Sequence, residues 1–234
     1  MQDKPNIIGA ALLAVTLLAG SATASAADDA PGIWLSGTLA GTMGDDDSRW
    51  LYSAEAHARY FDIGSGINQW LVRPAVGYAL GKDVRAWVGY SRYRIRSRTS
   101  NVADENRYWQ ELDWKAGAIG HGSLSLRGRL EQRDISLSSE IQHVMRLRVK
   151  YARTMTSGTA PSLVLSAESF IDLNETDWAG SAGLAQYRLY GGVEWQLGSG
   201  STLEVGYLHQ HIELESQVDR VNHLAVLGFK VRLQ

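Results

Sequence analysis

The sequence predicts an all-β fold, an antiparallel transmembrane β-barrel with an even strand number (10 or 12), short periplasmic turns and longer extracellular loops. Three observations predict it. Apolar and charged residues alternate along nearly every segment beyond the N-terminal region; Leu124, Leu126 and Leu130, for example, alternate with arginine and glutamate. Successive side chains of a strand point to opposite faces, so such a segment has one apolar and one charged face. The connections alternate between short and long, and the N-terminus has the features of an export signal.

The N-terminal segment, residues 1-26, is interpreted as a signal peptide. A short polar start with Lys4 precedes an apolar run over 7-19, and small residues end in Ala24-Ser25-Ala26. Secretory signals have this order, with cleavage after an Ala-x-Ala pattern. An uncleaved anchor is the alternative, but the apolar run is shorter than the roughly 20 residues that a membrane-spanning helix needs. Residues 27-234 are then expected to form a single outer-membrane β-barrel domain.

The composition excludes several classes of function. The 234 residues include no cysteine, which excludes disulfides, thiolate metal sites and cysteine nucleophiles. The 23 basic and 25 acidic residues nearly balance, whereas a nucleic-acid partner requires a basic excess. The composition therefore favours an exported barrel that binds no nucleic acid and is held together without covalent cross-links.

Eleven alternating segments follow one another with no sign of a linker. Strands are expected at about 33-43, 50-61, 67-80, 84-94, 107-117, 123-133, 143-153, 162-172, 186-197, 202-212 and 223-233. Their lengths are at or above the roughly 9 to 11 residues of a tilted membrane strand. Short glycine-containing turns are expected at 81-83, 120-122, 156-158 and 198-200, and longer loops at about 95-106, 134-142, 173-185 and 213-222. This asymmetry is typical of outer-membrane barrels, with the turns and the C-terminus in the periplasm.

The number of segments conflicts with the even number that bacterial single-chain barrels have. Counted back from the C-terminus, the segments from 50-61 onward form strands in consistent up-and-down order. Segment 33-43 would then begin on the wrong side of the membrane. Three explanations stay open at this point: the segment is not a full crossing, the N-terminus threads the lumen, or the pattern misses a strand.

Large aromatic residues near the ends of the apolar faces indicate which face meets lipid. An aromatic girdle is expected from Trp50, Tyr60, Trp70, Tyr78, Tyr187 and Trp195. Three of them lie at each of two heights, as at the two interfaces of a membrane. Alternation alone also fits a soluble barrel of lipocalin type, whose apolar face points inward. The girdle favours an outward apolar face, as does a last strand with Gly228, Val231 and Leu233 at the spacing that barrel-assembly machinery recognises.

Several short motifs resemble one bacterial family. They are LVRPAVGY at 71-78, NRYWQEL at 106-112, DLNETDW at 172-178, VGYLHQ at 205-210 and Asn222-His223. In this order, and over nearly all of the chain after the leader, they resemble the family catalogued as domain of unknown function 2490 (DUF2490). The resemblance implies an outer-membrane-type barrel, and it brings no established activity, cofactor or catalytic residue.

An outward apolar face places the charged face in the lumen. The expected lumen charge network consists of Glu55, Arg59, Arg73, Arg85, Arg107, Glu111, Asp113, Lys115, Arg127, Arg129, Glu131, Arg133, Arg146, Arg148, Glu168, Arg188, Glu194 and Glu204. Arginine suits this role because its planar guanidinium bridges carboxylates on neighbouring strands. One interpretation is a structural ladder of ion pairs that fills the barrel. The other is a narrow wet channel whose basic surplus favours anionic solutes, and barrel size alone does not decide between them.

An enzymatic role is the weaker alternative. His209 and His211 share one face of a strand, a spacing that fits a metal site or a general base. No carboxylate and serine near them form a nucleophile pattern, and Gly-x-Ser-x-Gly is absent from the sequence. The 174-178 loop has oxygen ligands suited to calcium but lacks EF-hand spacing. We therefore expect no catalytic residue, no metal and no cofactor. Further acidic residues are assigned to loops, where we expect them to bind the divalent cations of the outer leaflet. They are Asp104, Glu105, Glu140, Glu213, Glu215 and Asp219.

The sequence thus predicts an outer-membrane β-barrel of a Gram-negative bacterium with a structural or narrow-channel role and a charged, partly filled lumen. The expected partners are outer-membrane lipids and, during biogenesis, the barrel-assembly machinery, with the protein itself a monomer. The alternatives are an outer-membrane lipid-modifying enzyme and a soluble periplasmic ligand-binding barrel.

Overall fold

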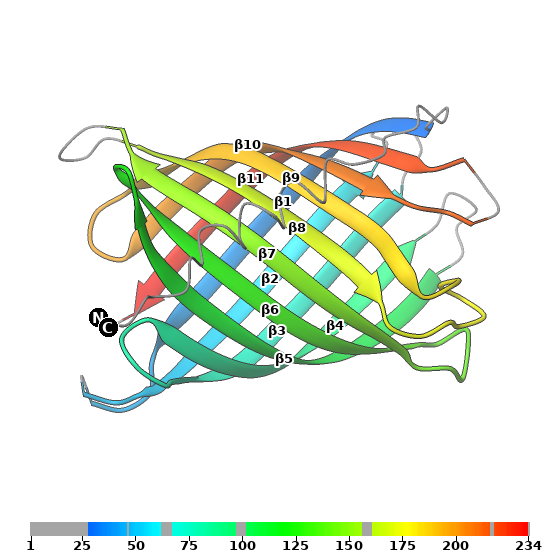
Figure 1. Cartoon of the computed structure of the whole chain (residues 1–234), viewed down its shortest axis with the longest axis horizontal. Helices are drawn as coiled ribbons and strands as arrows, with labels where there is room; N and C mark the ends of the chain where they lie inside the picture. Colours follow the sequence, from blue (N-terminus) through cyan, green and yellow to red (C-terminus); the bar gives the residue numbers. More distant parts are fainter. Residues whose placement is uncertain are drawn as a thin grey trace, which may run out of the picture.

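Alternating strand segments close on themselves in a computed structural model of the chain (Figure 1). The structure describes residues 28–45, 47–61, 67–96, 102–155, 161–215 and 218–233. The predicted signal peptide, 1-26, lies outside the described residues. Within these ranges no helix is long and apolar enough to cross a membrane.

The eleven strands follow one another in chain order around the barrel. Their bounds are β1 Asp28–Thr42, β2 Trp50–Phe61, β3 Ile67–Ala79, β4 Val84–Arg96, β5 Val102–Ile119, β6 Gly122–Ile135, β7 Gln142–Thr154, β8 Ser162–Asp172, β9 Gly183–Gln196, β10 Ser201–Ile212 and β11 Arg220–Leu233. Each strand pairs antiparallel with the next, so ten hairpin steps lead from β1 to β11. The predicted all-β barrel is confirmed.

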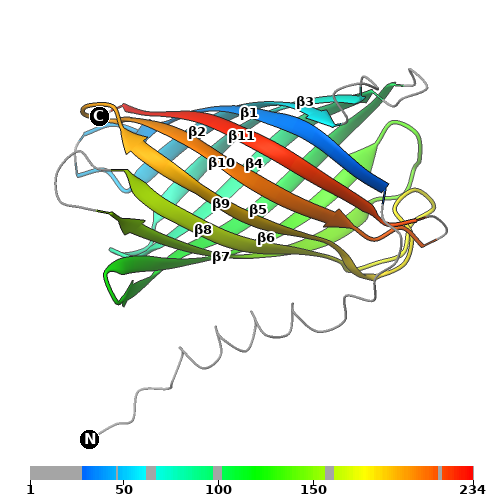
Figure 2. The ribbon, with the colours of Figure 1, turned by 90° about the horizontal axis from the view of Figure 1, so that it is seen from above.

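The barrel closes through a parallel pair, β1 with β11, so the prediction of 10 or 12 strands is wrong. Their register runs from Asp28 opposite Arg220 to Gly41 opposite Leu233, and Figure 2 shows the two strands side by side. Strands that alternate in direction leave the first and last parallel when their number is odd. A parallel ladder still pairs every edge group, and closure removes the free edges that an open sheet would expose. Segment 33-43 is therefore a full strand, and β1 begins at the end of the barrel opposite the C-terminus.

The parallel closure predicts a specific cross-link. Leu35 of β1 lies opposite Leu227 of β11, both are partly exposed, and the chain has no cysteine of its own. Neighbouring strand residues lie within the Cα separation that a disulfide spans. We expect Leu35→Cys with Leu227→Cys to cross-link on oxidation, as measured by mass spectrometry of the joined peptides.

The control for this cross-link is Leu35→Cys with Leu233→Cys. Leu233 lies opposite Gly41, six residues further along β1, which is about 20 Å of strand. The control pair is expected to stay reduced. Equal yields from the two pairs would contradict the register, and no cross-link in the matched pair would contradict the closure.

The two faces of the sheet have opposite character. Large apolar side chains on the outside are half exposed, as with Val88 at 59% and Leu112 at 54%. Charged side chains on the inside are buried, as with Glu131 at 1% and Arg129 at 2%. A soluble protein has the reverse arrangement, with charges almost never buried unless paired. The inside of this barrel therefore has to supply partners for its charges.

The fully described connections opposite the C-terminus are shorter than the expected loops. At the end that holds the C-terminus these connections are 80–83, 120–121 and 197–200, and at the other end they are 136–141 and 173–182 (Figure 1). The expected long loop at 95-106 is mostly strand, because β4 and β5 continue as a paired ribbon. Outer-face polar groups hold this ribbon together: the Arg92 guanidinium lies 3.0 Å from the Asp104 carboxylate, and the Tyr90 hydroxyl donates to Asn106 at 2.6 Å.

Candidate functional site: the charged barrel interior

Alternation along the strands places the predicted network residues on the inner face. Odd-numbered positions of β2 to β6 and even-numbered positions of β7 to β10 point inward, as the burial of Arg73, Glu111, Glu131, Arg146 and Glu168 shows. The network residues differ in depth: Glu131 is fully buried, whereas Lys115 lies exposed next to the bulge that ends the regular part of β5. The bulge uses Gly117, whose φ of 124° disfavours residues with a Cβ.

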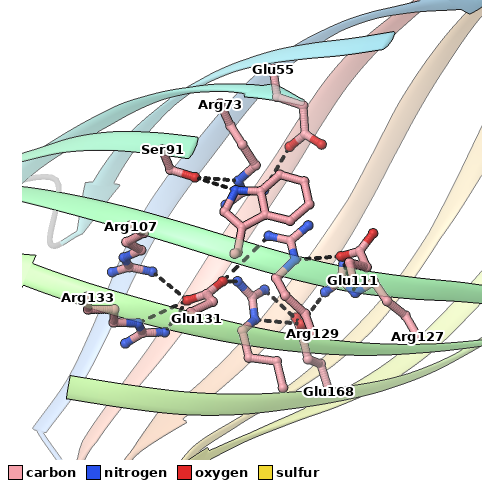
Figure 3. Close-up of polar contacts among 12 residues, drawn as sticks. Glu55, Arg73, Ser91, Arg107, Glu111, Arg127, Arg129, Glu131, Arg133 and Glu168 are labelled. Carbon is pink, nitrogen blue, oxygen red and sulfur yellow. Dashed lines mark hydrogen bonds and ion pairs between the residues drawn. The ribbon is translucent and has the colours of Figure 1, made fainter. Parts of the chain in front are cut away.

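Glu131 is the centre of the most buried part of the interior. Its carboxylate accepts a hydrogen bond from Arg146 at 2.6 Å. It also accepts one from Arg133 at 2.8 Å and lies 3.5 Å from Arg107 and from Arg129 (Figure 3). Four guanidinium groups thus surround one carboxylate. Buried charges of this kind are stable only when they are paired and hydrogen-bonded.

Glu168 and Glu111 extend this cluster toward the neighbouring strands. Glu168 accepts from Arg146 at 2.7 Å and also from Arg127. Glu111 accepts from Arg129 at 2.5 Å, and Arg127 lies 3.5 Å from it. Because Arg127, Arg129 and Arg146 each reach two carboxylates, β5 to β8 are joined across the lumen side as well as through their backbones.

A second group of contacts lies between β2, β3 and β4. Arg73 donates to Glu55 at 2.9 Å, to the Ser91 hydroxyl at 3.1 Å and to the Tyr93 hydroxyl at 2.9 Å. The His57 ring lies 3.0 Å from the same carboxylate of Glu55. The guanidinium of Arg73 therefore joins the three strands on the lumen side.

Aromatic side chains inside the barrel are the residues that sequence reasoning missed. The guanidinium of Arg107 lies 3.7 Å from the Tyr93 ring, that of Arg129 lies 4.0 Å from Trp109, and that of Arg146 lies 4.3 Å from Phe170. Guanidinium groups bind the faces of aromatic rings, so these rings pack between the ion pairs. The signal that could have found them is parity, because Tyr93 and Trp109 share the odd positions of the inward charges.

Lysines hold the interior near the end that carries the C-terminus. Glu194 accepts from Lys150 at 3.1 Å and from Lys230 at 2.9 Å, and Lys230 also lies 2.6 Å from Glu204. These contacts join β7, β9, β10 and β11. The ion pairs therefore extend around most of the wall.

Several predicted network members make no ion pair with another described residue. These are Arg59, Arg85, Asp113, Lys115, Arg148 and Arg188. Three of them, Arg59, Arg148 and Arg188, line a cavity of about 240 Å³ inside the barrel, together with Glu55, Glu168 and Glu204 and with the hydroxyls of Ser36, Thr38, Ser166 and Tyr190. The described interior thus combines a network of ion pairs with a small charged cavity beside it.

Aromatic residues of the predicted girdle lie on the outer face at both ends. Trp50 and Tyr78 are cross-strand partners whose rings meet edge to face at 5.0 Å. Tyr60 and Trp70 are exposed near the opposite ends of their strands. Tyr187 and Trp195 are half-buried positions near the two ends of β9.

Comparison with known proteins gives a family. The model of a family described as "Protein of unknown function (DUF2490)" matches residues 31–222, which is most of the chain. The chain belongs to the DUF2490 family. This DUF2490 protein is 33% identical over 226 residues to an uncharacterised protein of Methylorubrum extorquens, a match that covers 94% of this chain and 96% of the relative. No solved structure matches. The predicted family resemblance is confirmed, and the family description states no activity.

A cluster of rings lies outside the barrel, where β9, β10 and β11 approach the end opposite the C-terminus. His211 stacks on Tyr187 at 4.9 Å, and its Nε2 lies 3.2 Å from the Asp219 carboxylate. The Tyr207 hydroxyl lies 2.5 Å from His223 Nδ1. The His209 ring lies 5.9 Å from the Tyr187 ring and 5.5 Å from the His223 ring. His209 and His211 therefore belong to this outer cluster of the DUF2490 barrel and not to its interior. Partial burial and the nearby Asp219 raise the pKa of Glu213, which follows β10.

The loop considered for calcium is held by hydrogen bonds to its neighbour. Asn174 accepts from the backbone N–H of His143 at 2.7 Å, and the backbone N–H of Asp177 donates to the Glu140 carboxylate at 2.7 Å. The Ser138 hydroxyl donates to Asp177 at 2.6 Å. Within the described ranges no group of three or more histidine, aspartate or glutamate side chains is arranged to hold a metal ion.

Proposed function

We propose that this DUF2490 protein is a structural, non-enzymatic β-barrel integral to the outer membrane of a Gram-negative bacterium. The observation that carries the proposal is the inverted polarity of the sheet, with buried charges inside and half-exposed large apolar side chains outside. A barrel in water would leave that apolar surface in contact with solvent at a cost of about 25 cal/mol per Å². In a bilayer the same surface meets hydrocarbon, and closure satisfies every backbone group.

The outer aromatic residues support this location. Trp50 and Tyr78 lie at one end of the barrel, and Tyr60 and Trp70 lie toward the other. Amphipathic rings favour the two membrane interfaces. With the C-terminus in the periplasm, β1 runs parallel to β11 and therefore begins at the extracellular end. The predicted signal peptide and the barrel-assembly machinery belong to the same proposal, as does a monomeric state with outer-membrane lipids as partners.

The structural role is supported by how the interior is filled. Four arginines converge on Glu131, and further contacts join Glu111 and Glu168 to two of the same guanidinium groups. Such a layer fixes strand register and leaves little room for diffusion. A narrow channel is the second candidate, favoured by the adjoining cavity, which has a basic surplus. Single-channel recordings separate the two roles, because a structural barrel is electrically silent.

The test of location is heat-modifiable migration of the full-length protein from fractionated cells. Closed membrane barrels stay folded in SDS until boiled, so we expect the protein in the outer-membrane fraction with unboiled and boiled bands that migrate differently. Recovery in the osmotic-shock fraction would contradict the proposal and favour a soluble periplasmic barrel. An altered lipid profile on overexpression, lost when His211 is replaced by alanine, would contradict the non-enzymatic role.

A further inference from the structure

The cavity inside the barrel carries a strong excess of positive charge. Eight arginine and lysine side chains line it against three glutamates. Its walls come from both sides of the barrel, including Trp34 of β1 and Ser166 of β8. A cavity with this lining attracts anions and repels cations.

Five of the eight cations are already held by carboxylates. Arg73 pairs with Glu55, Arg127 and Arg146 with Glu168, and both lysines with Glu194. The other three, Arg59, Arg148 and Arg188, have no carboxylate within ion-pair distance among the residues that the structure describes. The cavity thus holds three cations that its own walls do not neutralise.

Two of these cations are next to a carboxylate that is already occupied. Arg148 of β7 and Arg188 of β9 are the cross-strand neighbours of Glu168 on its two sides. Glu168 nevertheless accepts from Arg127 and Arg146. Arg148 makes no side-chain hydrogen bond within the described part of the chain. Arg188 has neutral neighbours. Its guanidinium lies 4.5 Å from the Phe170 ring, and its Nε donates to the Gln186 amide oxygen at 2.7 Å.

Arg59 gives an independent indication that the cavity binds a ligand. Its side chain is 5% exposed, and its guanidinium lies 3.8 Å from the Trp34 ring and donates to Gln69 at 2.8 Å. Its Nε is buried and has no hydrogen-bond partner. Buried donors in native proteins nearly always have a partner, and where no protein atom supplies it, a water molecule or an ion can do so.

The size of the cavity limits what it holds. Its volume of about 240 Å³ is below the roughly 300 to 1,000 Å³ of sites for drug-sized ligands. Arginine forks bind the paired oxygens of phosphate and carboxylate groups, and the hydroxyls of Ser36, Thr38 and Ser166 are further donors. The lining therefore fits a small oxyanion with more than one negative charge.

We propose that the cavity is a binding site for a small multivalent oxyanion, of the phosphate or dicarboxylate class, held by Arg148, Arg188 and Arg59. The anion's negative charges offset most of the charge of the three buried arginines. The proposal rests on the closed, charged barrel and not on membrane location, so it is testable on folded protein in detergent whatever the outcome of fractionation.

The test is calorimetric titration of the refolded protein with inorganic phosphate and, separately, with malonate, in low-chloride buffer. We expect saturable binding of at least one of the two, and the tighter of them identifies the class. Arg148→Gln is expected to weaken that binding about 10- to 100-fold, because a hydrogen bond to a charged group is lost. Arg148 makes no ion pair that the fold requires, and circular dichroism verifies that the variant is folded.

The matched control is Arg85→Gln. Arg85 is also an inward arginine without an ion pair, but it does not line the cavity. The Arg85→Gln variant is expected to have a dissociation constant for the anion within a factor of about two of the wild-type value, because only a screened long-range charge is lost. No binding of either anion by folded wild-type protein, or equal weakening by the two variants, would overturn the site. The unfolding temperature gives a second measurement. We expect it to rise with anion concentration for the wild-type protein but not for folded Arg188→Gln.

Discussion

Glu131→Gln is expected to lower the free energy of unfolding of the barrel by about 3–5 kcal/mol, because it leaves buried arginines without their shared counter-charge. Glu131 is 1% exposed and contacts Arg146, Arg133, Arg107 and Arg129. The amide accepts hydrogen bonds, but its NH₂ group faces guanidinium donors. Denaturant unfolding of the refolded protein, followed by tryptophan fluorescence, measures the change.

The control for Glu131→Gln is Asp83→Asn. Asp83 is an exposed carboxylate in the connection between β3 and β4, so the same chemical change there is expected to stay within about 0.5 kcal/mol of wild type. A comparably small loss for Glu131→Gln would show that the interior is hydrated well enough to replace the carboxylate.

The double variant Glu131→Gln with Arg133→Gln separates pairing from burial. Arg133 makes its ion pair with Glu131, so its removal also removes one of the cations that Glu131→Gln leaves unpaired. The two losses are expected to be less than additive, with a coupling energy of about 0.5–3 kcal/mol. Strict additivity would contradict the shared network.

Parity along the strands predicts that these charges share one face, but it does not predict how they pair. The alternation of Arg127, Arg129, Glu131 and Arg133 fixes their common face, since strand side chains have a period of two. The contacts of Glu131 with four arginines depend on the register of β5, β6 and β7, and this register is set by long-range strand pairing. The parallel pairing of β1 with β11 could not be predicted for the same reason, because alternation indicates strands but not which strands pair.

Glu105 shows where the pattern fails. The sequence assigned it to a loop with Asp104, whereas β5 begins at Val102 and Glu105 is 2% exposed and paired with Arg107 at 2.7 Å. The outer positions of this part of β5 carry Asp104 and Asn106, so apolar alternation is absent. Their partners are Arg92 and polar groups on β4. Where a strand continues beyond the apolar band, it has polar residues on both faces. Alternation cannot distinguish such a strand from a loop.

Leu189→Arg on the outer face is expected to destabilise the barrel in lipid vesicles by about 2–4 kcal/mol, because an arginine at the bilayer mid-plane loses its hydration. Leu189 lies in the middle of β9 and is 47% exposed. Denaturant unfolding in vesicles measures the loss. In water the same substitution at a half-exposed position has no comparable cost, since surface changes stay within about 0.5 kcal/mol.

The matched control for Leu189→Arg is Leu137→Arg. Leu137 is 71% exposed in the connection between β6 and β7, outside the strands, and the chemical change is identical. It is expected to be neutral in vesicles, so the difference between the two leucines measures the solvent of the outer face independently of arginine itself. Equal, small effects would mean that β9 faces water, and the apolar surface around Leu189 would then need a protein partner to cover it. A large effect confined to Leu189 would mean that hydrocarbon covers the apolar face, and the buried arginines inside would then be the polar side of a membrane wall.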